Sequence, residues 1–371
     1  MIKLRSKIVY FLFPVLLLIG AYVLIGSAGS PQESRDLKGL TSHATTISLD
    51  PPNDLNFAGE IVPLQDFDVQ ERLDKELIRY IYYHSATIMN IKRAARWKGE
   101  MTRILKSNGV PEDFFYLCVA ESHLQNATSP AGAKGFWQFM KATGIGYGLE
   151  INKEVDERYD PIKSTHAACK YLKEAYRKFG NWTLVAASYN MGMGGVQKQL
   201  DRQKVDNYYD LYLNRETAAY VFRILALKTV LENPGNYGFD IPKDQLYTPT
   251  RYTKVTVDTT INSLVQFAQQ HGTTYKMLKV MNPWILNDGL KVGLDSDGNR
   301  KKYTIKIPKG AKISDSAANE MLPDSIPVDT TMVTVSDSLV DTLSNDAPDG
   351  LVPAPDETVQ DSTTEENSTE K

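Results

Sequence analysis

The sequence predicts a mainly α-helical protein that ends in a small α+β module. Apolar residues recur at helical spacing from Val69 to Ile91. Helix-capping and helix-stop residues then follow one another over residues 111–232. Alternating apolar residues over 252–257 and 303–307 indicate two strands, with a short helix expected from Ser263. A chain of 371 residues is long enough for two such domains.

The N-terminus carries an export signal. Lys3, Arg5 and Lys7 precede an uncharged apolar run over residues 8–25. This length lies between a signal-peptide core and a membrane span, so residues 1–26 are either a cleaved signal peptide or an N-terminal membrane anchor. A buried soluble helix is disfavoured because such helices rarely lack charge on every face. Both favoured alternatives place the rest of the chain outside the cytoplasm.

Changes in composition divide the rest of the chain. A Pro-punctuated stretch without periodicity reads as a linker, and an acidic tail rich in Ser and Thr cannot bury enough surface to fold. The expected segments are a linker at 27–65, a helical domain at 66–235 with its catalytic core at 111–235, a small domain at 250–310 and a disordered tail at 311–371.

Charge and cysteine usage exclude several classes of function. The chain has 42 basic and 45 acidic residues, so it has no basic excess for binding nucleic acid. Its five histidines show no metal-ligand spacing, and we expect neither a metal nor a cofactor. Cys118 and Cys169 lie on apolar helix faces and are expected to be free thiols.

Glu121 is the strongest candidate for a catalytic acid. It follows Phe114, Leu117 and Cys118 on one face of a predicted helix, so its carboxyl points toward apolar surroundings. Removal from water disfavours the charged form and raises the pKa of such a group, as a general acid at neutral pH requires. A solvated Glu at the end of a helix is the alternative. His123 is interpreted as a structural histidine rather than a group that tunes Glu121.

Two further segments suit a sugar-binding cleft. Gln138 is embedded in the large apolar side chains of residues 136–140, and Tyr189-Asn190 is followed by several glycines. Acetamido sugars have an apolar face and many hydroxyl and amide groups, which such a mixture recognises. Core aromatics beside a Gly-rich helix stop are the alternative interpretation of each segment taken singly.

Taken together, these segments resemble the soluble lytic transglycosylase family over roughly residues 66–234. The matching elements, in order, are Glu121-Ser122, Ser129 with residues 131–140, residues 156–161, Tyr189-Asn190 with its glycines, Glu216-Thr217 and Tyr220-Val221. The resemblance implies a lysozyme-like helical fold and action on peptidoglycan glycan strands in the cell envelope, on the periplasmic side. Lys141, where the family commonly has Pro, and His123 and Phe136 depart from the pattern and bear on subsite preference.

The resemblance also implies roles for individual residues. Glu121 would be the catalytic acid, and Tyr189 would supply the hydroxyl that orients it. The remaining expected substrate-binding residues are Ser122, Gln138, Met140 and Asn190. In the family's reaction one carboxyl acts first as acid and then as base, and 1,6-anhydro-N-acetylmuramic acid ends form without added water.

The other nearby carboxylates, Asp156, Glu157 and Asp160, are better interpreted as a helix cap and an ion pair. A muramidase that uses water, or an inactive peptidoglycan-binding protein, remains the alternative to a transglycosylase.

The C-terminal domain resembles a LysM repeat, a glycan-binding unit of two strands and two short helices. Matching segments include residues 252–257, 271–273, Asn282-Pro283 and 305–308. Val257 stands where Gly is usual, and residues 288–302 resemble an insertion, so the sequence leaves glycan binding by this module open. Asp295 and Asp297 are expected to form a turn rather than a calcium loop.

Overall fold

The computed structural model describes residues 51–309. The expected signal peptide or anchor at 1–26 and the expected tail at 311–371 lie outside the described residues. Within residues 51–309, no helix is both long enough and apolar enough to cross a bilayer.

The described chain opens with a small hairpin that corrects the expected linker. Strands β1 (Asn56–Phe57) and β2 (Glu60–Ile61) pair antiparallel. Phe57 is fully buried, and its ring packs edge-on against Phe114 with 5.2 Å between the centroids. Leu55 and Val62 are buried beside it. Leu55, Phe57 and Val62 therefore belong to the domain core, where composition alone suggested a tether.

The helical domain is built from eight α-helices between residues 67 and 232 of the described chain. They are α2 (Phe67–Tyr82), α3 (His84–Ser107), α4 (Phe114–Ser122), α5 (Lys141–Gly146), α6 (Pro161–Phe179), α7 (Trp182–Met191), α8 (Met193–Gln203) and α9 (Arg215–Glu232). Short 3₁₀ helices η2 (Glu157–Tyr159), η3 (Pro234–Tyr237) and η4 (Lys243–Gln245) lie in the connections. The predicted mainly α fold is confirmed.

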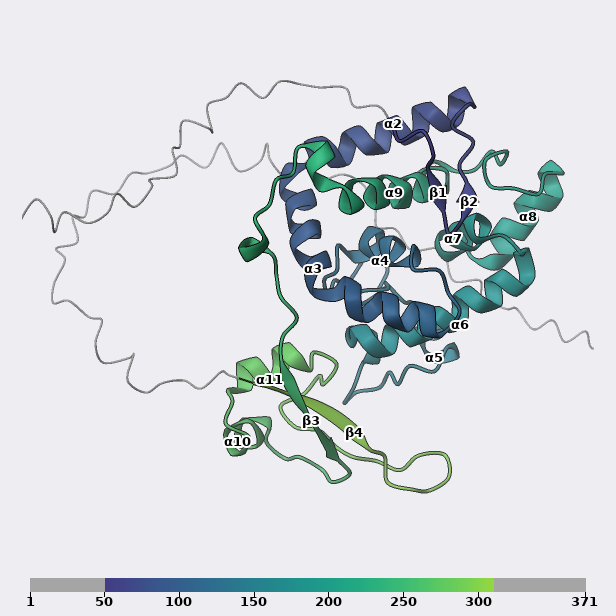
Figure 1. The fold of residues 1–371 in the computed structure, drawn as a ribbon. Coiled ribbons are helices and arrows are strands. Elements are labelled where there is room, and N and C mark those ends of the chain that lie inside the picture. The colour runs from purple at the N-terminus through teal and green to yellow at the C-terminus, as the bar shows by residue number, and fades with distance from the viewer. Residues whose placement is uncertain (1–50, 310–371) are drawn as a thin grey trace, which may run out of the picture. The chain divides into compact units, whose positions relative to one another are not determined.

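Helix α4 lies at the centre of this domain. Every residue of α4 except Ala120 is buried. Helix α3 packs on one side of α4 and α9 on the other, while α2 lies along α9 (Figure 1). A helix that is apolar on all sides is stable only inside a core, so the sequence of α4 fixes its central place.

Local capping sets the helix ends where the sequence predicted them. The Asp160 side chain accepts hydrogen bonds from Ile162 N and Lys163 N at the start of α6, and Gly180 ends that helix in the left-handed region at φ 65°. Asp156 caps η2 and pairs with Arg158 at 2.8 Å. The prediction of a cap and an ion pair in this segment is confirmed.

The C-terminal module contains the two predicted strands. Strand β3 (Tyr252–Val257) pairs antiparallel with β4 (Tyr303–Pro308), and helices α10 (Leu264–Gln270) and α11 (Tyr275–Met281) lie between them in sequence. The core of the module includes Leu264, Leu278, Trp284 and Ile305. Asp295 Oδ1 accepts hydrogen bonds from Asp297 N and Asn299 N, so this loop is the predicted turn.

One residue of the helical domain completes the core of this module. Val155 precedes η2 and is fully buried within the apolar cluster of residues 264–307. It forms a β-bridge with Ile285, and the adjacent Asp156 N donates to Trp284 O at 2.9 Å. Glu150, from the same loop, accepts hydrogen bonds from Lys301 Nζ at 2.8 Å and Tyr303 Oη at 3.0 Å. The segment before η2 is therefore shared by two apolar clusters of the chain.

We predict that Val155→Asp lowers the free energy of unfolding by at least about 3 kcal/mol, because it buries an unpaired charge. Val265→Asp is the matched control, since Val265 is 46% exposed on α10. Urea unfolding followed by circular dichroism measures both variants. Equal losses would contradict the assigned burial of Val155.

Candidate active site

Glu121 lies in the last turn of α4. The next two residues, His123 and Leu124, have left-handed backbone angles of φ 52° and 55°, which stop the helix and turn the chain away. The Glu121 side chain is buried, and its residue is 9% exposed. Its Oε1 accepts a hydrogen bond from the hydroxyl of Tyr220 on α9. The burial predicted from the helical spacing is therefore present.

The surroundings favour the protonated form of Glu121. Burial raises the pKa of its carboxyl from 4.5 to about 7, and the negative charge of Glu216 acts in the same direction. The hydrogen bond from Tyr220 and the positive charge of Arg223 oppose this rise. Desolvation is the largest of these effects. A carboxylic acid with this pKa can both give and take a proton near neutral pH.

The hydroxyl that contacts Glu121 belongs to Tyr220, which corrects the role expected for Tyr189. Tyr189 Oη donates instead to Trp137 O at 2.8 Å. The Tyr189 ring packs against Tyr171 and Phe139, with centroid distances of 5.1 and 6.1 Å. Tyr189 thus supports the wall of the site from α7. The sequence resemblance included Tyr220, but motif order does not show which of two tyrosine hydroxyls reaches the acid.

Gln138 forms part of a tightly turned loop that contacts α4, where Cys118 Sγ donates to Phe136 O at 3.4 Å. The Gln138 backbone is left-handed at φ 46°, and its Nε2 donates to Ala127 O at 3.2 Å and Gly135 O at 2.7 Å. Within the described chain its buried Oε1 has no hydrogen-bond partner. The two contacts of Nε2 thus fix the amide orientation and leave a buried carbonyl oxygen that can still accept a hydrogen bond.

Arg158 holds this loop in place. Its guanidinium donates to Gly132 O at 3.2 Å and to Phe139 O at 3.1 Å, while it pairs with Asp156. Gly135 lies so close to the Arg158 backbone that a Cβ at position 135 would be 1.8 Å from the Arg158 carbonyl oxygen. Only glycine fits there, at φ 80°.

The other predicted site residues lie on three elements. Ser122 is buried, and its hydroxyl donates back to Cys118 O at 3.4 Å. Met140 is half-buried at the start of α5. Asn190 Oδ1, at the end of α7, accepts a hydrogen bond from Thr217 Oγ1 of α9 at 2.8 Å. This contact fixes the Asn190 amide with its NH₂ group available as a donor.

His123 and the two cysteines carry no candidate catalytic function. His123 Nδ1 lies 3.1 Å from Asn90 Oδ1, and burial lowers the pKa of its imidazole. The thiols of Cys118 and Cys169 are free and buried, and burial raises the pKa of both. Such thiols are poor nucleophiles.

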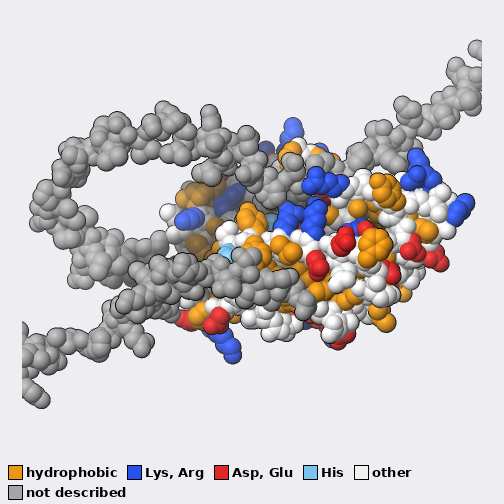
Figure 2. All heavy atoms as spheres, turned by 90° about the horizontal axis from the view of Figure 1, so that it is seen from above, with side chains coloured by type: hydrophobic (Ala, Val, Ile, Leu, Met, Phe, Trp, Pro, Cys, Tyr) orange, Lys and Arg blue, Asp and Glu red, His pale blue; other side chains and the backbone are white. Residues whose placement is uncertain are grey.

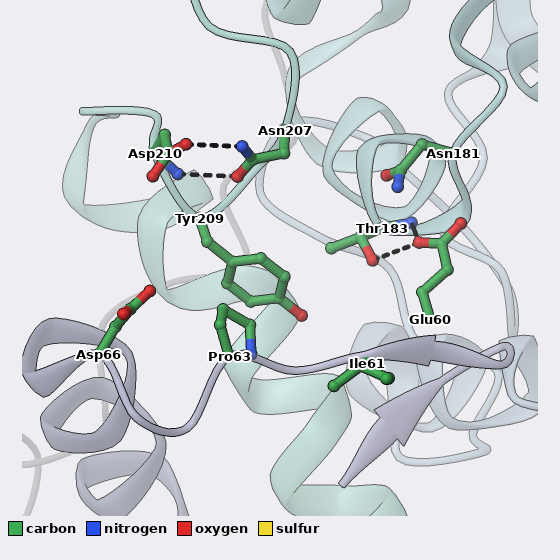
Figure 3. Close-up of a pocket in the computed structure, with 9 residues that line it drawn as sticks. All are labelled: Glu60, Ile61, Pro63, Asp66, Asn181, Thr183, Asn207, Tyr209 and Asp210. Carbon is green, nitrogen blue, oxygen red and sulfur yellow. Dashed lines mark hydrogen bonds between the residues drawn. The ribbon is translucent and has the colours of Figure 1, made fainter.

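A separate pocket of about 290 Å³ lies at the other end of α7. Figure 3 shows Glu60 beside Thr183 in this pocket and Asn207 bonded to Asp210. Glu60 accepts hydrogen bonds from the backbone N–H of Trp182 and of Thr183, so it caps α7. None of the predicted site residues lines this pocket. Glu60, Asn181 and Thr183 of its lining hold the start of α7, and Asn207 bonds Asp210.

The charge on the surface is mixed. Figure 2 shows Lys and Arg side chains interspersed with Asp and Glu on the face that it displays. A face without one dominant sign of charge does not steer a charged partner over long distances.

Sequence comparisons place both domains in known families. Residues 102–211 match the transglycosylase SLT domain, and residues 253–311 match the soluble lytic transglycosylase C-terminal LysM-like domain. The chain is therefore an SLT-domain protein with a C-terminal LysM-like domain, as its motifs predicted.

The curated relatives agree with this assignment. The chain is homologous to membrane-bound lytic murein transglycosylase D of Escherichia coli strain K12, with 28% identity over 289 residues. This alignment covers 75% of this chain and 61% of that protein, and a second Escherichia coli strain gives the same values. The chain thus spans about three-fifths of the length of these relatives. Among solved structures, the lytic transglycosylase Slt from Pseudomonas aeruginosa aligns at a TM-score of 0.31 with 22% identity, covering 41% of this chain and 26% of that one.

The raised pKa of Glu121 predicts a pH-dependent stability. Between pH 4.5 and about 7 the folded state holds a proton that the unfolded state releases, so stability falls as the pH rises through this window. At about 1.4 kcal/mol per pKa unit, the loss amounts to about 3 kcal/mol by pH 8.

Glu121→Gln removes this titration. We expect the variant to unfold at a higher temperature than the wild type at pH 8, with the difference shrinking toward pH 4. Calorimetry at both pH values measures the effect. A constant difference between the two proteins would show that Glu121 titrates normally.

Proposed function

We propose that this protein is a lytic transglycosylase that cleaves the β-1,4 bond between N-acetylmuramic acid and N-acetylglucosamine in peptidoglycan. The observation that carries the proposal is Glu121, a buried carboxylic acid with a raised pKa that is held by Tyr220 inside an SLT domain. Desolvation keeps the proton on this group near neutral pH, which is the state that acid catalysis needs.

The proposed reaction uses Glu121 twice. The protonated carboxyl donates its proton to the glycosidic oxygen, the bond from that oxygen to C1 of the muramic acid breaks, and the glucosamine leaves with a free hydroxyl. The Glu121 carboxylate then takes the proton from the 6-hydroxyl of the same muramic acid, whose oxygen bonds to C1. A 1,6-anhydro ring results, Glu121 regains its proton, and no water is consumed.

The carboxylates around the site support a mechanism with a single acid. Ordinary glycosidases use two carboxyl groups about 5 to 9.5 Å apart, and the second is free to act as nucleophile or base. Asp156 and Asp160 are engaged as helix caps, and Glu157 pairs with Lys163. Glu216 is held by Arg223 at 2.7 Å. Each of these groups is occupied by a partner within the protein.

Each of the expected substrate-binding residues has a different proposed role. The free Oε1 of Gln138 accepts from a hydroxyl or acetamido N–H, and the Asn190 amide donates to a sugar or acetamido oxygen. Met140 supplies apolar contact for a sugar face. The buried Ser122 hydroxyl donates to Cys118 O and so supports the end of α4 next to the acid.

The site of action in this proposal is the cell envelope. The apolar run at residues 8–25 would carry the chain across the inner membrane or anchor it there, with the catalytic domain on the periplasmic side. Peptidoglycan glycan strands are then the partner of the SLT domain. The LysM-like domain is a second candidate contact with the same polymer.

We predict that Glu121→Gln lowers turnover by at least about a hundredfold, because the amide keeps the volume of the side chain but cannot deliver a proton. Purified peptidoglycan is digested, and the muropeptides are analysed by mass spectrometry. The wild-type products should end in 1,6-anhydro-N-acetylmuramic acid. Glu112→Gln is the control, because Glu112 forms an exposed pair with Lys106.

The same digest separates the alternatives. Reducing muramic acid ends as the sole product would identify a muramidase that uses water. Binding of peptidoglycan without any cleavage by the wild-type chain would identify an inactive binding protein. Full activity of Glu121→Gln would reject the proposed acid.

Two tyrosine variants test the assignment of the contacting hydroxyl. Tyr220→Phe should lower turnover about 10- to 100-fold, because the acid loses the group that orients it. Since that hydrogen bond lowers the pKa of Glu121, its loss should also move the alkaline limb of the pH–rate profile to higher pH. Tyr189→Phe should leave that limb in place, because its hydroxyl bonds Trp137 O. A limb that moves only in Tyr189→Phe would reverse the assignment.

A further inference from the structure

Three polar residues of α9 share the face that meets Glu121. Glu216, Tyr220 and Arg223 stand at positions i, i+4 and i+7 of the helix, so they lie in one row. Tyr220, in the middle, bonds Glu121. The two charged residues therefore flank the residue that touches the acid, one turn to either side.

Arg223 joins two carboxylates from different helices. Its Nη1 lies 2.7 Å from Glu216 Oε1, and its Nε lies 3.8 Å from Glu76 Oε2 of α2. Glu76 Oε2 also lies 3.5 Å from Arg79 Nη1. The side chains of Arg223 and Glu76 are 16% and 4% exposed, whereas that of Glu216 is 32% exposed. Glu216 is thus more exposed than Arg223 and Glu76, while Arg79 is 35% exposed at the other end of the network.

The spacing and the burial of this ion-pair network differ from those of pairs that only stabilise a helix. Charged pairs that stabilise a helix are usually three or four residues apart, whereas Glu216 and Arg223 are two turns apart. An Arg that is mostly withdrawn from water must recover a desolvation penalty, which an exposed pair does not incur. A low-dielectric position also strengthens the effect of each charge on its neighbours.

The two charges act on Glu121 with opposite signs. Glu216 raises the pKa of the Glu121 carboxyl, and Arg223 lowers it. The other groups that interact with Glu121 are neutral near pH 7: Cys118 from its own helix, Tyr189 from α7 and Tyr220 from α9. The charged side chains that act most on the acid are therefore the two ends of one salt bridge.

We propose that Glu216 and Arg223 form a charge-balancing pair that sets the protonation state of Glu121 and hence the pH range in which the enzyme works. They are positioning residues, because they act through Glu121. The inference rests on the proposed role of Glu121 and deepens it. It predicts that changing either member shifts the working pH, in opposite directions, and that changing both restores it.

The test measures kcat/KM on purified peptidoglycan between pH 5 and pH 9 for the full chain. Glu216→Gln leaves Arg223 unopposed, so the alkaline limb should move to lower pH by at least about half a unit. Arg223→Gln leaves Glu216 and Glu76 unopposed, so the limb should move to higher pH. The double variant should return close to the wild-type profile.

Controls separate this role from a structural one. Glu112→Gln removes the same charge from an exposed pair with Lys106 and should leave the limb unmoved. If the pair only joined α2 to α9, both variants would lose stability and activity without opposite shifts of the limb. Should Arg223→Gln fail to fold, the comparison of Glu216→Gln with Glu112→Gln decides the question.

The outcomes also distinguish the two proposals. Full activity of Glu121→Gln would reject the proposed acid and this inference with it. An inactive Glu121→Gln, together with an unmoved limb in Glu216→Gln, would overturn only the charge-balancing pair.

Discussion

The withdrawal of one carboxyl group from water is the constraint on which the rest of the site depends. Glu121 lies in the last turn of a helix whose residues are all buried except Ala120, so its side chain is largely withdrawn from solvent. An ionised carboxylate in such a place is costly, and the protonated acid is the form that the fold favours. The left-handed residues that follow, His123 and Leu124, end α4 and turn the chain beside the acid.

Helix α9 supplies much of what this acid needs. Its first turns carry the hydroxyl that contacts Glu121, the threonine that fixes Asn190 and the carboxylate that Arg223 holds. The start of α9 is fastened by Asn214, whose side chain caps it, and by Tyr208 Oη, which donates to Thr217 O at 2.9 Å. Because one rigid helix carries these groups, their spacing is set by helical geometry rather than by loop conformation.

The segment before α6 contacts both the LysM-like domain and the loop of the candidate site. Val155 fills the core of the LysM-like domain, while Arg158, three residues further on, holds the loop that carries Gln138. In the sequence, the carboxylates of this segment were the other nearby candidates for a catalytic carboxyl besides Glu121. They are used instead to cap helices and to neutralise Arg158 and Lys163, which explains why a run so rich in charge is largely buried.

The sequence by itself determined the helical domain, the two strands of the module, most helix ends and the burial of Glu121. These properties follow from periodicity and capping within short windows, and the resemblance of ordered motifs indicated the family. Tertiary structure decided that the hairpin at residues 55–62 contributes side chains to the core, that Val155 completes the second domain, and that Tyr220 rather than Tyr189 bonds the acid. Glu121 and Tyr220 are 99 positions apart, and only the packing of α4 against α9 brings them together. Local patterns indicate which face of a helix is apolar, but they do not indicate which partner helix covers it. The packing of α9 against α4 brought the Tyr220 hydroxyl and the charges of Glu216 and Arg223 to the side of Glu121.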